Sequence, residues 1–250
     1  PNSGKTTLFN ALTGSSQYVG NWPGVTVERK TGKLKINKEI TLVDLPGIYS
    51  LSPYTLEEVI TRNYIATEKP DAIINIVDAS NIERNLYLTT QLVELGIPVV
   101  IALNMMDIVN KRGDKIDIAK LSKDLGCPVF ECSAAKQTGI NEVAEAAIKA
   151  ANGAKAPEIN HRFPEAVETA FANIEKLSSS YVKDGIPSWN AIKLFERDEK
   201  IIEALALPEN VSAEIETEIV KAEEALDDDS ESIITNHRYS YIEKVIKDSV

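Results

Sequence analysis

The first residues of the chain have the composition of a loop that binds phosphate. The pattern G-x-x-x-x-G-K-[ST] describes such a loop, and Pro1 to Thr6 supply its last six positions, ending in Gly4-Lys5-Thr6. Backbone N–H groups of such a loop surround phosphates at the start of a helix. Lys5 would neutralise the β- and γ-phosphates, and the Thr6 hydroxyl would bind Mg²⁺. On its own, this match also fits a turn before a helix.

Three further motifs each follow a predicted strand. In Asp44-Leu45-Pro46-Gly47, the carboxylate could hold the Mg²⁺ shell and the glycine N–H a γ-phosphate. In Asn104-Met105-Met106-Asp107, the last carboxylate could accept hydrogen bonds from the ring N–H and the exocyclic amine of guanine, an amine that adenine lacks. Ser133-Ala134-Ala135 could offer a backbone N–H to the guanine oxygen. Because ligands bind at the carboxyl ends of parallel strands, four such motifs in order predict a guanine-nucleotide site.

The elements that must position these motifs alternate along the first 152 residues. Short apolar segments predict strands over 40–43, 72–77, 99–103 and 129–130. Apolar residues at helical spacing predict helices over 5–12, 55–66, 82–95 and 141–151. This alternation is typical of an α/β fold with a mainly parallel sheet and helices on both sides.

The second part of the chain differs in pattern and in charge. Residues 152–164 read NGAKAPEINHRFP, which is typical of a linker, and the pattern beyond them is helical throughout. Residues 153–250 carry a net charge of −10, and residues 1–152 a net charge of −1. The sequence therefore predicts a small acidic helical domain after an α/β domain.

Composition excludes several classes of protein. The net charge of −11 over 250 residues argues against a nucleic-acid-binding surface. With two cysteines and two histidines, neither a disulfide scaffold nor a zinc site is expected. The apolar runs are too short to span a membrane, and no secretion signal is evident at the first residue.

The motifs and the segments between them resemble the TRAFAC-class GTPases, and more closely the ferrous iron transport protein B (FeoB) family. The resemblance is carried by GNWPGVTVERKTG at Gly20–Gly32, DLPGIYSL at Asp44–Leu51 and RNLYLTTQLVELGIPVVIALNMMD at Arg84–Asp107. It covers residues 1–152. The acidic helical part resembles the helical, dissociation-inhibitor-like domain that follows the GTPase domain in this family.

The resemblance implies a Ras-like P-loop GTPase domain over 1–152 without its first strand, a linker over 153–160 and the helical domain over 161–250. It implies GTP binding and slow hydrolysis on the cytoplasmic side of the cell membrane, coupled to ferrous-iron uptake. The implied partners are a guanine nucleotide, the membrane permease domain of the full-length chain, small accessory proteins of the uptake system and a second copy of the chain. Nucleic acid is not among them.

The resemblance also implies roles for individual residues. Lys5, Thr26 and Gly47 would be catalytic. Mg²⁺ would be held by Thr6, Thr26 and Asp44, and K⁺ by Asn2 and the carbonyls of Gly20 and Trp22. GTP or GDP would contact Pro1, Asn2, Ser3, Gly4, Lys5, Thr6, Thr7, Gly24, Val25, Thr26, Val27, Glu28, Asp44, Leu45, Pro46, Gly47, Asn104, Met105, Met106, Asp107, Ser133, Ala134 and Ala135.

Several alternatives remain open from the sequence. One is a soluble assembly-factor GTPase, although such proteins usually carry a basic surface for RNA. Another is a nucleotide-sensing binding module with incidental hydrolysis. Asn2 either ligates a cation or caps the turn of the loop, and Trp22 is either exposed for recognition or packed against the helical part. Ile48 stands where Ras-like enzymes have a water-orienting glutamine, which predicts slow hydrolysis.

Overall fold

The structure is a computed structural model that describes residues 3–14, 17–52, 54–153, 159–183 and 186–250. The chain forms two compact units. The first comprises Pro1–Asn160 together with Ile242–Val250, and the second comprises His161–Tyr241. Among the described residues, no helix is long and apolar enough to cross a membrane.

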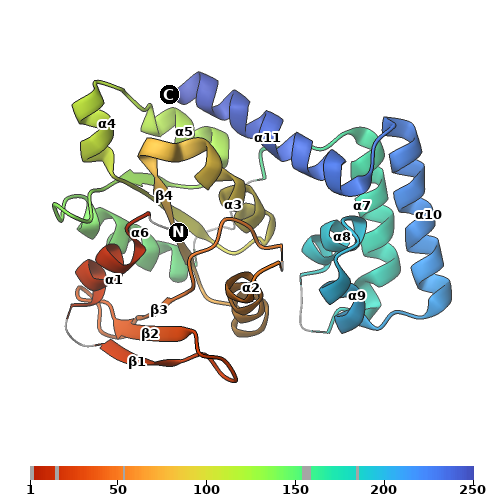
Figure 1. The fold of residues 1–250 in the computed structure, drawn as a ribbon, viewed down its shortest axis with the longest axis horizontal. Coiled ribbons are helices and arrows are strands. Elements are labelled where there is room, and N and C mark those ends of the chain that lie inside the picture. The colour runs from red at the N-terminus through yellow and green to blue at the C-terminus, as the bar shows by residue number, and fades with distance from the viewer. Residues whose placement is uncertain (1–2, 15–16, 53, 154–158, 184–185) are drawn as a thin grey trace. The chain divides into compact units, whose positions relative to one another are not determined.

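The first unit alternates helices and strands (Figure 1). Its strands are β1 (Gln17–Asn21), β2 (Glu28–Lys33), β3 (Thr41–Asp44), β4 (Ile73–Asp78), β5 (Val99–Asn104) and β6 (Val129–Glu131). Its helices are α1 (Lys5–Thr13), α2 (Leu56–Glu68), α3 (Ile82–Glu94), α4 (Met106–Arg112), α5 (Ile118–Leu125) and α6 (Ile140–Ala151). The four predicted strands and four predicted helices are confirmed, and the α/β class with them.

The strands form two sheets of opposite type. β4, β5 and β6 are parallel, with Asp78 opposite Asn104 and Leu103 opposite Glu131. β1, β2 and β3 are antiparallel, so the parallel arrangement describes only one of the two sheets. The β1–β2 hairpin was not predicted because its residues are mostly polar and at least partly exposed, without the apolar run of a buried strand.

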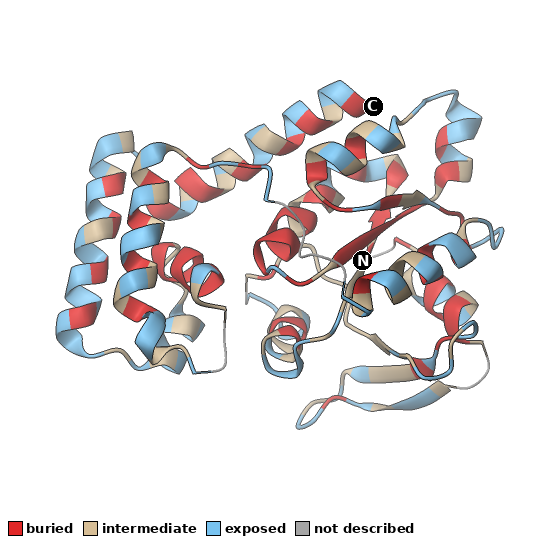
Figure 2. Ribbon diagram, turned by 180° about the vertical axis from the view of Figure 1, so that it is seen from behind, coloured by how far each residue is buried: buried red, intermediate tan, exposed pale blue. Residues whose placement is uncertain are grey.

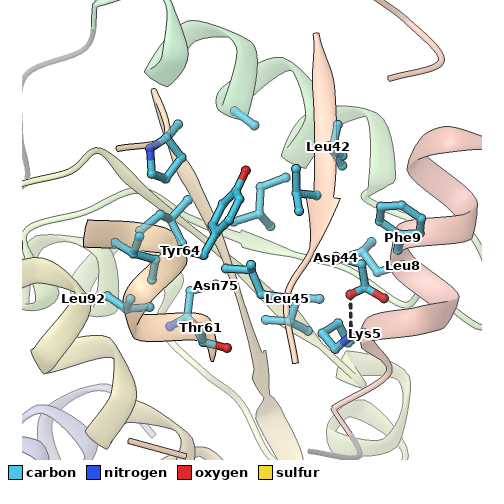
Figure 3. A pocket seen from close by; sticks show the side chains of 18 of the residues that line it. Lys5, Leu8, Phe9, Leu42, Asp44, Leu45, Thr61, Tyr64, Asn75 and Leu92 are labelled. Carbon is cyan, nitrogen blue, oxygen red and sulfur yellow. Dashed lines mark hydrogen bonds and ion pairs between the residues drawn. The ribbon is translucent and has the colours of Figure 1, made fainter. Parts of the chain in front are cut away.

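A cavity of about 800 Å³ lies between β3 and β4, whose edges are not paired with each other. Its lining is largely apolar and includes Leu8 and Leu12 of α1, Leu42 of β3 and Ile76 of β4 (Figure 3). The strand that the resemblance places before the phosphate loop is not among the described residues.

The core of the first unit forms where α1 and α6 meet the strands. Every residue of β5 is buried, as expected of the middle strand of a sheet covered on both faces (Figure 2). Leu8 and Leu12 of α1 pack in one cluster with Ala102 of β5 and Val143 of α6. This packing fixes the start of α1 beside the end of β5, where two of the sequence motifs lie.

The second unit is helical, as predicted. It contains α7 (Glu165–Ser178), α8 (Pro187–Phe195), α9 (Glu199–Leu205), α10 (Glu209–Leu226) and the first part of α11 (Ser230–Ser249). One apolar cluster joins these helices, with Val167, Ile174, Phe195 and Ile219 at its centre. The exposed faces carry the acidic residues, which explains how a unit with so much negative charge retains an apolar interior (Figure 2).

Arg197 joins α8, α10 and α11 at one point of this unit. Its guanidinium binds Glu216 at 2.6 Å, Glu223 at 2.6 and 2.9 Å, and the Ser230 hydroxyl at 2.9 Å. Glu223 also accepts the backbone N–H of Ser230. The hydrogen bonds from Arg197 lower the pKa of the Glu223 carboxyl. The planar fork of an arginine suits several carboxylate contacts at once, whereas one ammonium does not.

We expect Arg197→Ala to lower the free energy of unfolding of the second unit by about 1–2 kcal/mol, because it leaves Glu223 partly buried without its cation. Urea unfolding monitored by circular dichroism measures this. Lys200→Ala is the control, since its pair with Glu203 is exposed and should change stability by less than about 0.5 kcal/mol. The difference should disappear as the pH falls below the usual carboxyl range and Glu223 is protonated. Equal effects of the two substitutions at neutral pH would contradict this role.

Candidate functional site

The start of α1 has the geometry of a phosphate-binding turn. Gly4 caps the helix with a positive φ of 82°, and the first turn of α1 has neither a side-chain cap nor an acidic residue. Its first N–H groups are therefore open to an anion. A Cβ atom on Gly4 would lie 2.4 Å from the Asn104 amide nitrogen, so only glycine fits at this position.

Lys5 and Asp44 lie together beside this turn. The Lys5 ammonium forms an ion pair with the Asp44 carboxylate at the end of β3 (Figure 3). Thr6 and Thr7 are exposed on the same turn of α1. A cation-binding carboxylate, a threonine hydroxyl and a lysine thus share one corner of the unit, and this donor set suits Mg²⁺ and a polyphosphate. Leu45, Pro46 and Gly47 continue from Asp44 along the rim of the cavity.

Asn104 connects three of the four motifs. Its amide nitrogen donates to the Ser3 carbonyl at 2.7 Å, and its amide oxygen accepts the backbone N–H of Ala134 at 2.9 Å. The side chain is buried and both of its polar ends are used. The Asn104 side chain therefore holds the loops of Ser3 and Ala134 together. We expect Asp107 to recognise the base.

The Asp107 carboxylate is fixed by a hydrogen bond and is ionised, so it can accept further hydrogen bonds. Its carboxylate accepts the Ser133 hydroxyl at 3.0 Å and lies 3.7 Å from the Lys136 ammonium. The Ser133 hydrogen bond lowers the pKa of the Asp107 carboxyl, so the group is ionised at neutral pH. Met105, with a positive φ of 66°, turns the chain between β5 and α4, and Met106 is buried behind it. This strained turn directs Asp107 to the end of the sheet.

The segment that carries Thr26 lies apart from this group of residues. Gly24, Val25, Thr26 and Val27 form the tip between β1 and β2, and Thr26 is exposed. Within the described residues, Thr26 makes no hydrogen bond with Lys5, Thr6 or Asp44. Glu28 begins β2 and pairs with Lys30. The predicted sites at Pro1 and Asn2 lie outside the described residues.

Gly20 and Trp22, whose carbonyls are the proposed cation ligands, take part in the backbone pairing of the β1–β2 hairpin. Gly20 lies opposite Arg29 in the β1–β2 ladder. The Trp22 carbonyl accepts the Val25 N–H at 3.2 Å, and the Trp22 N–H donates to the Val27 carbonyl. The Trp22 ring is buried against Tyr64 and Arg29 of the same unit, so exposed recognition by this side chain is wrong.

The loop after Gly47 is anchored by residues that the motifs did not identify. The Gln91 amide oxygen accepts the Leu51 N–H at 2.7 Å and the Ser50 hydroxyl at 3.2 Å. The Arg84 guanidinium stacks 3.8 Å from the centre of the Tyr49 ring. The sequence carries no periodic signal for such contacts, because they join a loop to the face of α3.

Both cysteines are free and buried, and the Cys132 thiol lies 3.9 Å from the amide oxygen of Asn104. Burial raises the pKa of the Cys127 thiol to about 12 and that of Cys132 to about 11, so both remain protonated and unreactive. Among the described residues, no group of three or more His, Cys, Asp or Glu side chains could hold a metal ion.

Family models match both parts of the chain. The model described as Ferrous iron transport protein B matches residues 1–147, and the model of the FeoB cytosolic helical domain matches residues 163–250. The chain belongs to the FeoB family. The resemblance predicted from the motifs is thereby confirmed, as is the succession of a Ras-like GTPase fold and a helical domain.

Individual FeoB relatives agree with this assignment. The Fe(2+) transporter FeoB of Escherichia coli K12 is 57% identical over 145 residues, which cover 56% of this chain and 19% of that protein. The FeoB of Salmonella typhimurium LT2 gives the same values. The chain thus spans about a fifth of the length of these FeoB transporters.

Solved structures of FeoB fragments match nearly the whole chain. NFeoB from S. thermophilus bound to GDP.AlF4- and K+ is 47% identical with a TM-score of 0.89, covering 99% of this chain and 96% of that one. A mutant of the same protein bound to GDP is 46% identical with a TM-score of 0.92, covering 100% of this chain and 96% of that one.

Proposed function

We propose that the chain binds GTP and hydrolyses it slowly to GDP and phosphate. The observation that carries this proposal is the hydrogen-bond network of Asn104, which brings the phosphate turn at Ser3 and the Ala134 loop together beside the ionised Asp107. Structures of a FeoB relative with GDP support the same assignment. Asp107 and the Ala134 loop would select guanine, with Ser133 and Ala135 flanking the base.

The proposed hydrolysis transfers the γ-phosphate of GTP to water. A water molecule attacks the γ-phosphorus, the bond from this phosphorus to the β–γ bridging oxygen breaks, and the water's proton passes to the released phosphate. Lys5 would leave Asp44 to neutralise the β- and γ-oxygens, and the Gly47 N–H would bind the γ-phosphate. Mg²⁺, held by Thr6, Asp44 and Thr26, would supply further positive charge. Ile48 offers no group that orients water, which accounts for slow turnover.

A monovalent cation would supply charge that no arginine provides. The Asn2 amide and the carbonyls of Gly20 and Trp22 are its proposed ligands, and K+ is bound in the NFeoB structure with GDP.AlF4-. The Trp22 carbonyl accepts the Val25 N–H at the tip of the hairpin, so we expect this tip to change conformation when the cation site forms.

In the full-length protein, this portion would lie on the cytoplasmic side of the membrane and couple nucleotide state to ferrous-iron uptake. The name of the E. coli relative, an Fe(2+) transporter, supports that context. Its proposed partners are the permease domain, small accessory proteins and further copies of the chain. The proposed sequence limits of the GTPase domain, the linker and the helical domain are 1–152, 153–160 and 161–250, although Ile242–Val250 at the end of the helical domain group with the first compact unit.

A direct test is the release of phosphate by a chain that carries the complete phosphate-loop motif. We expect Mg²⁺-dependent turnover of GTP, with ATP at the same concentration turned over far more slowly. The Lys5→Ala variant of the same chain should lose turnover, because the γ-phosphate is then less neutralised. Equal turnover of ATP and GTP would contradict guanine selection, and binding of GTP without any turnover would favour a sensing module.

A further inference from the structure

Two aromatic rings and one guanidinium join the β1–β2 hairpin to α2. The Trp22 and Tyr64 rings meet edge to face with centroids 5.3 Å apart. The Arg29 guanidinium carbon lies 4.9 Å from the centre of the Trp22 ring and 5.9 Å from that of Tyr64. Trp22 and Arg29 lie on the hairpin, and Tyr64 extends from α2 toward the cavity (Figure 3). We call these three residues the Trp22 cluster.

The Trp22 cluster holds polar atoms that lack hydrogen bonds. Trp22 Nε1 and Arg29 Nε are buried without a partner. Within the described residues, Arg29 forms no ion pair with a carboxylate, and its half-buried guanidinium lies against the two ring faces. Burying donors without hydrogen bonds costs free energy. We therefore expect the cluster to change readily to a conformation in which these donors are hydrated or paired.

The same cluster fixes the backbone that the proposed cation would need. With its ring held by Tyr64 and Arg29, Trp22 keeps its carbonyl in the turn to Val25. Turning that carbonyl toward a cation beside the phosphates would require the turn from Trp22 to Val25 to change its conformation. The position of the Trp22 ring is therefore linked to the availability of the Trp22 carbonyl.

We propose that the Trp22 cluster is a latch that holds the β1–β2 hairpin in the conformation described above and opposes formation of the monovalent-cation site. This inference rests on the proposed function and adds a regulatory element to it. Arg29 and Tyr64 act as positioning residues through Trp22. Because α2 follows the loop of Gly47, the latch also links the two segments that would contact the γ-phosphate.

The first experiment tests the latch without any turnover. Trp22 and Trp189 are the only tryptophans, so the Trp189→Phe background makes Trp22 the sole indole fluorophore. We expect iodide to quench Trp22 weakly in this chain and several-fold more strongly after Tyr64→Leu or Arg29→Met. Tyr64→Phe should behave as the parent, because it keeps the ring, and Tyr54→Leu controls for the loss of an exposed tyrosine. Strong quenching in the parent would overturn the latch.

The second experiment titrates K⁺ in a chain with the complete phosphate-loop motif, in the presence of Mg²⁺, GDP and aluminium fluoride. Trp22 should become accessible to an uncharged quencher as K⁺ is added. Tyr64→Leu should lower the half-saturating K⁺ concentration about fivefold or more, as expected if the latch and the cation compete for one equilibrium, and Tyr64→Phe should not. Release of Trp22 by K⁺ without hydrolysis of GTP would overturn the proposed function but support the latch. K⁺-stimulated hydrolysis with Trp22 still protected would overturn the latch alone.

Discussion

Asp107→Asn is expected to weaken GTP binding by roughly a thousandfold and to favour xanthosine triphosphate instead, since a site built around particular hydrogen bonds rejects a ligand that leaves them unmade. In the proposed site, the Asp107 carboxylate would accept two guanine N–H groups. An asparagine offers one acceptor and one donor, which matches the ring N–H and the carbonyl that xanthine carries in place of the amine. The Ser133 hydroxyl can still donate to the asparagine oxygen, so the loop should keep its position.

Competition between labelled GDP and unlabelled GTP, ATP or xanthosine triphosphate measures this change in a chain with the complete loop. Asp114→Asn is the matched control, because it removes the same charge from an exposed position just after α4. Asp107→Asn with GTP affinity close to that of the parent would show that Asp107 does not read the base. Protonation of Asp107 has a similar consequence, so guanine affinity should fall only below the usual carboxyl pH range.

Replacing Na⁺ by K⁺ at constant ionic strength is expected to raise GTP hydrolysis at least about tenfold, because one well-placed charge contributes several kcal/mol to a transition state in a water-poor site. Asn2→Ala should remove this stimulation while leaving the slow rate in Na⁺ nearly unchanged. The physical reason is that the substitution removes the amide oxygen proposed to ligate the cation, whereas Lys5 and the proposed Mg²⁺ ligands remain.

Initial rates of phosphate release in the two salts measure this effect. Asn141→Ala is the control, since Asn141 is exposed on α6 and should keep the full response to K⁺. If Asn2 only caps the turn of the loop, Asn2→Ala should lower the rates in both salts alike. Equal rates of the parent in K⁺ and Na⁺ would end the cation proposal.

The parallel sheet and its motifs could be predicted because both leave local signals. Buried strands such as Val99–Asn104 are continuous apolar runs, and the motif residues follow them directly. α4 and α5 were missed because they are short, at seven and eight residues, and bury few side chains. The β1–β2 hairpin was missed because its strands are mostly polar and carry no apolar pattern of their own, although they pair directly with each other.

The contacts that organise the site could not be predicted from spacing. The sequence predicts Asn104 as a residue that contacts the nucleotide, but its amide joins Ser3 to Ala134, which lie 101 and 30 residues away in the sequence. The same holds for Gln91, whose partners lie about 40 residues earlier. A motif indicates which residues a site needs, whereas tertiary contacts determine which of them bind the ligand and which hold the loops in place.

The end of α11 determines which truncated forms of the chain keep the first unit intact. Its residues from Ile242 onward group with the first unit, where the Ser249 carbonyl accepts the Asp117 N–H at 2.7 Å and Asp248 lies 3.6 Å from the Lys120 ammonium. The second unit is thus an insertion within the first, with a covalent connection at each of its ends. Truncation after Asn160 removes a piece of the first unit as well as the insertion, whereas excision of His161–Tyr241 with the ends rejoined leaves that piece attached.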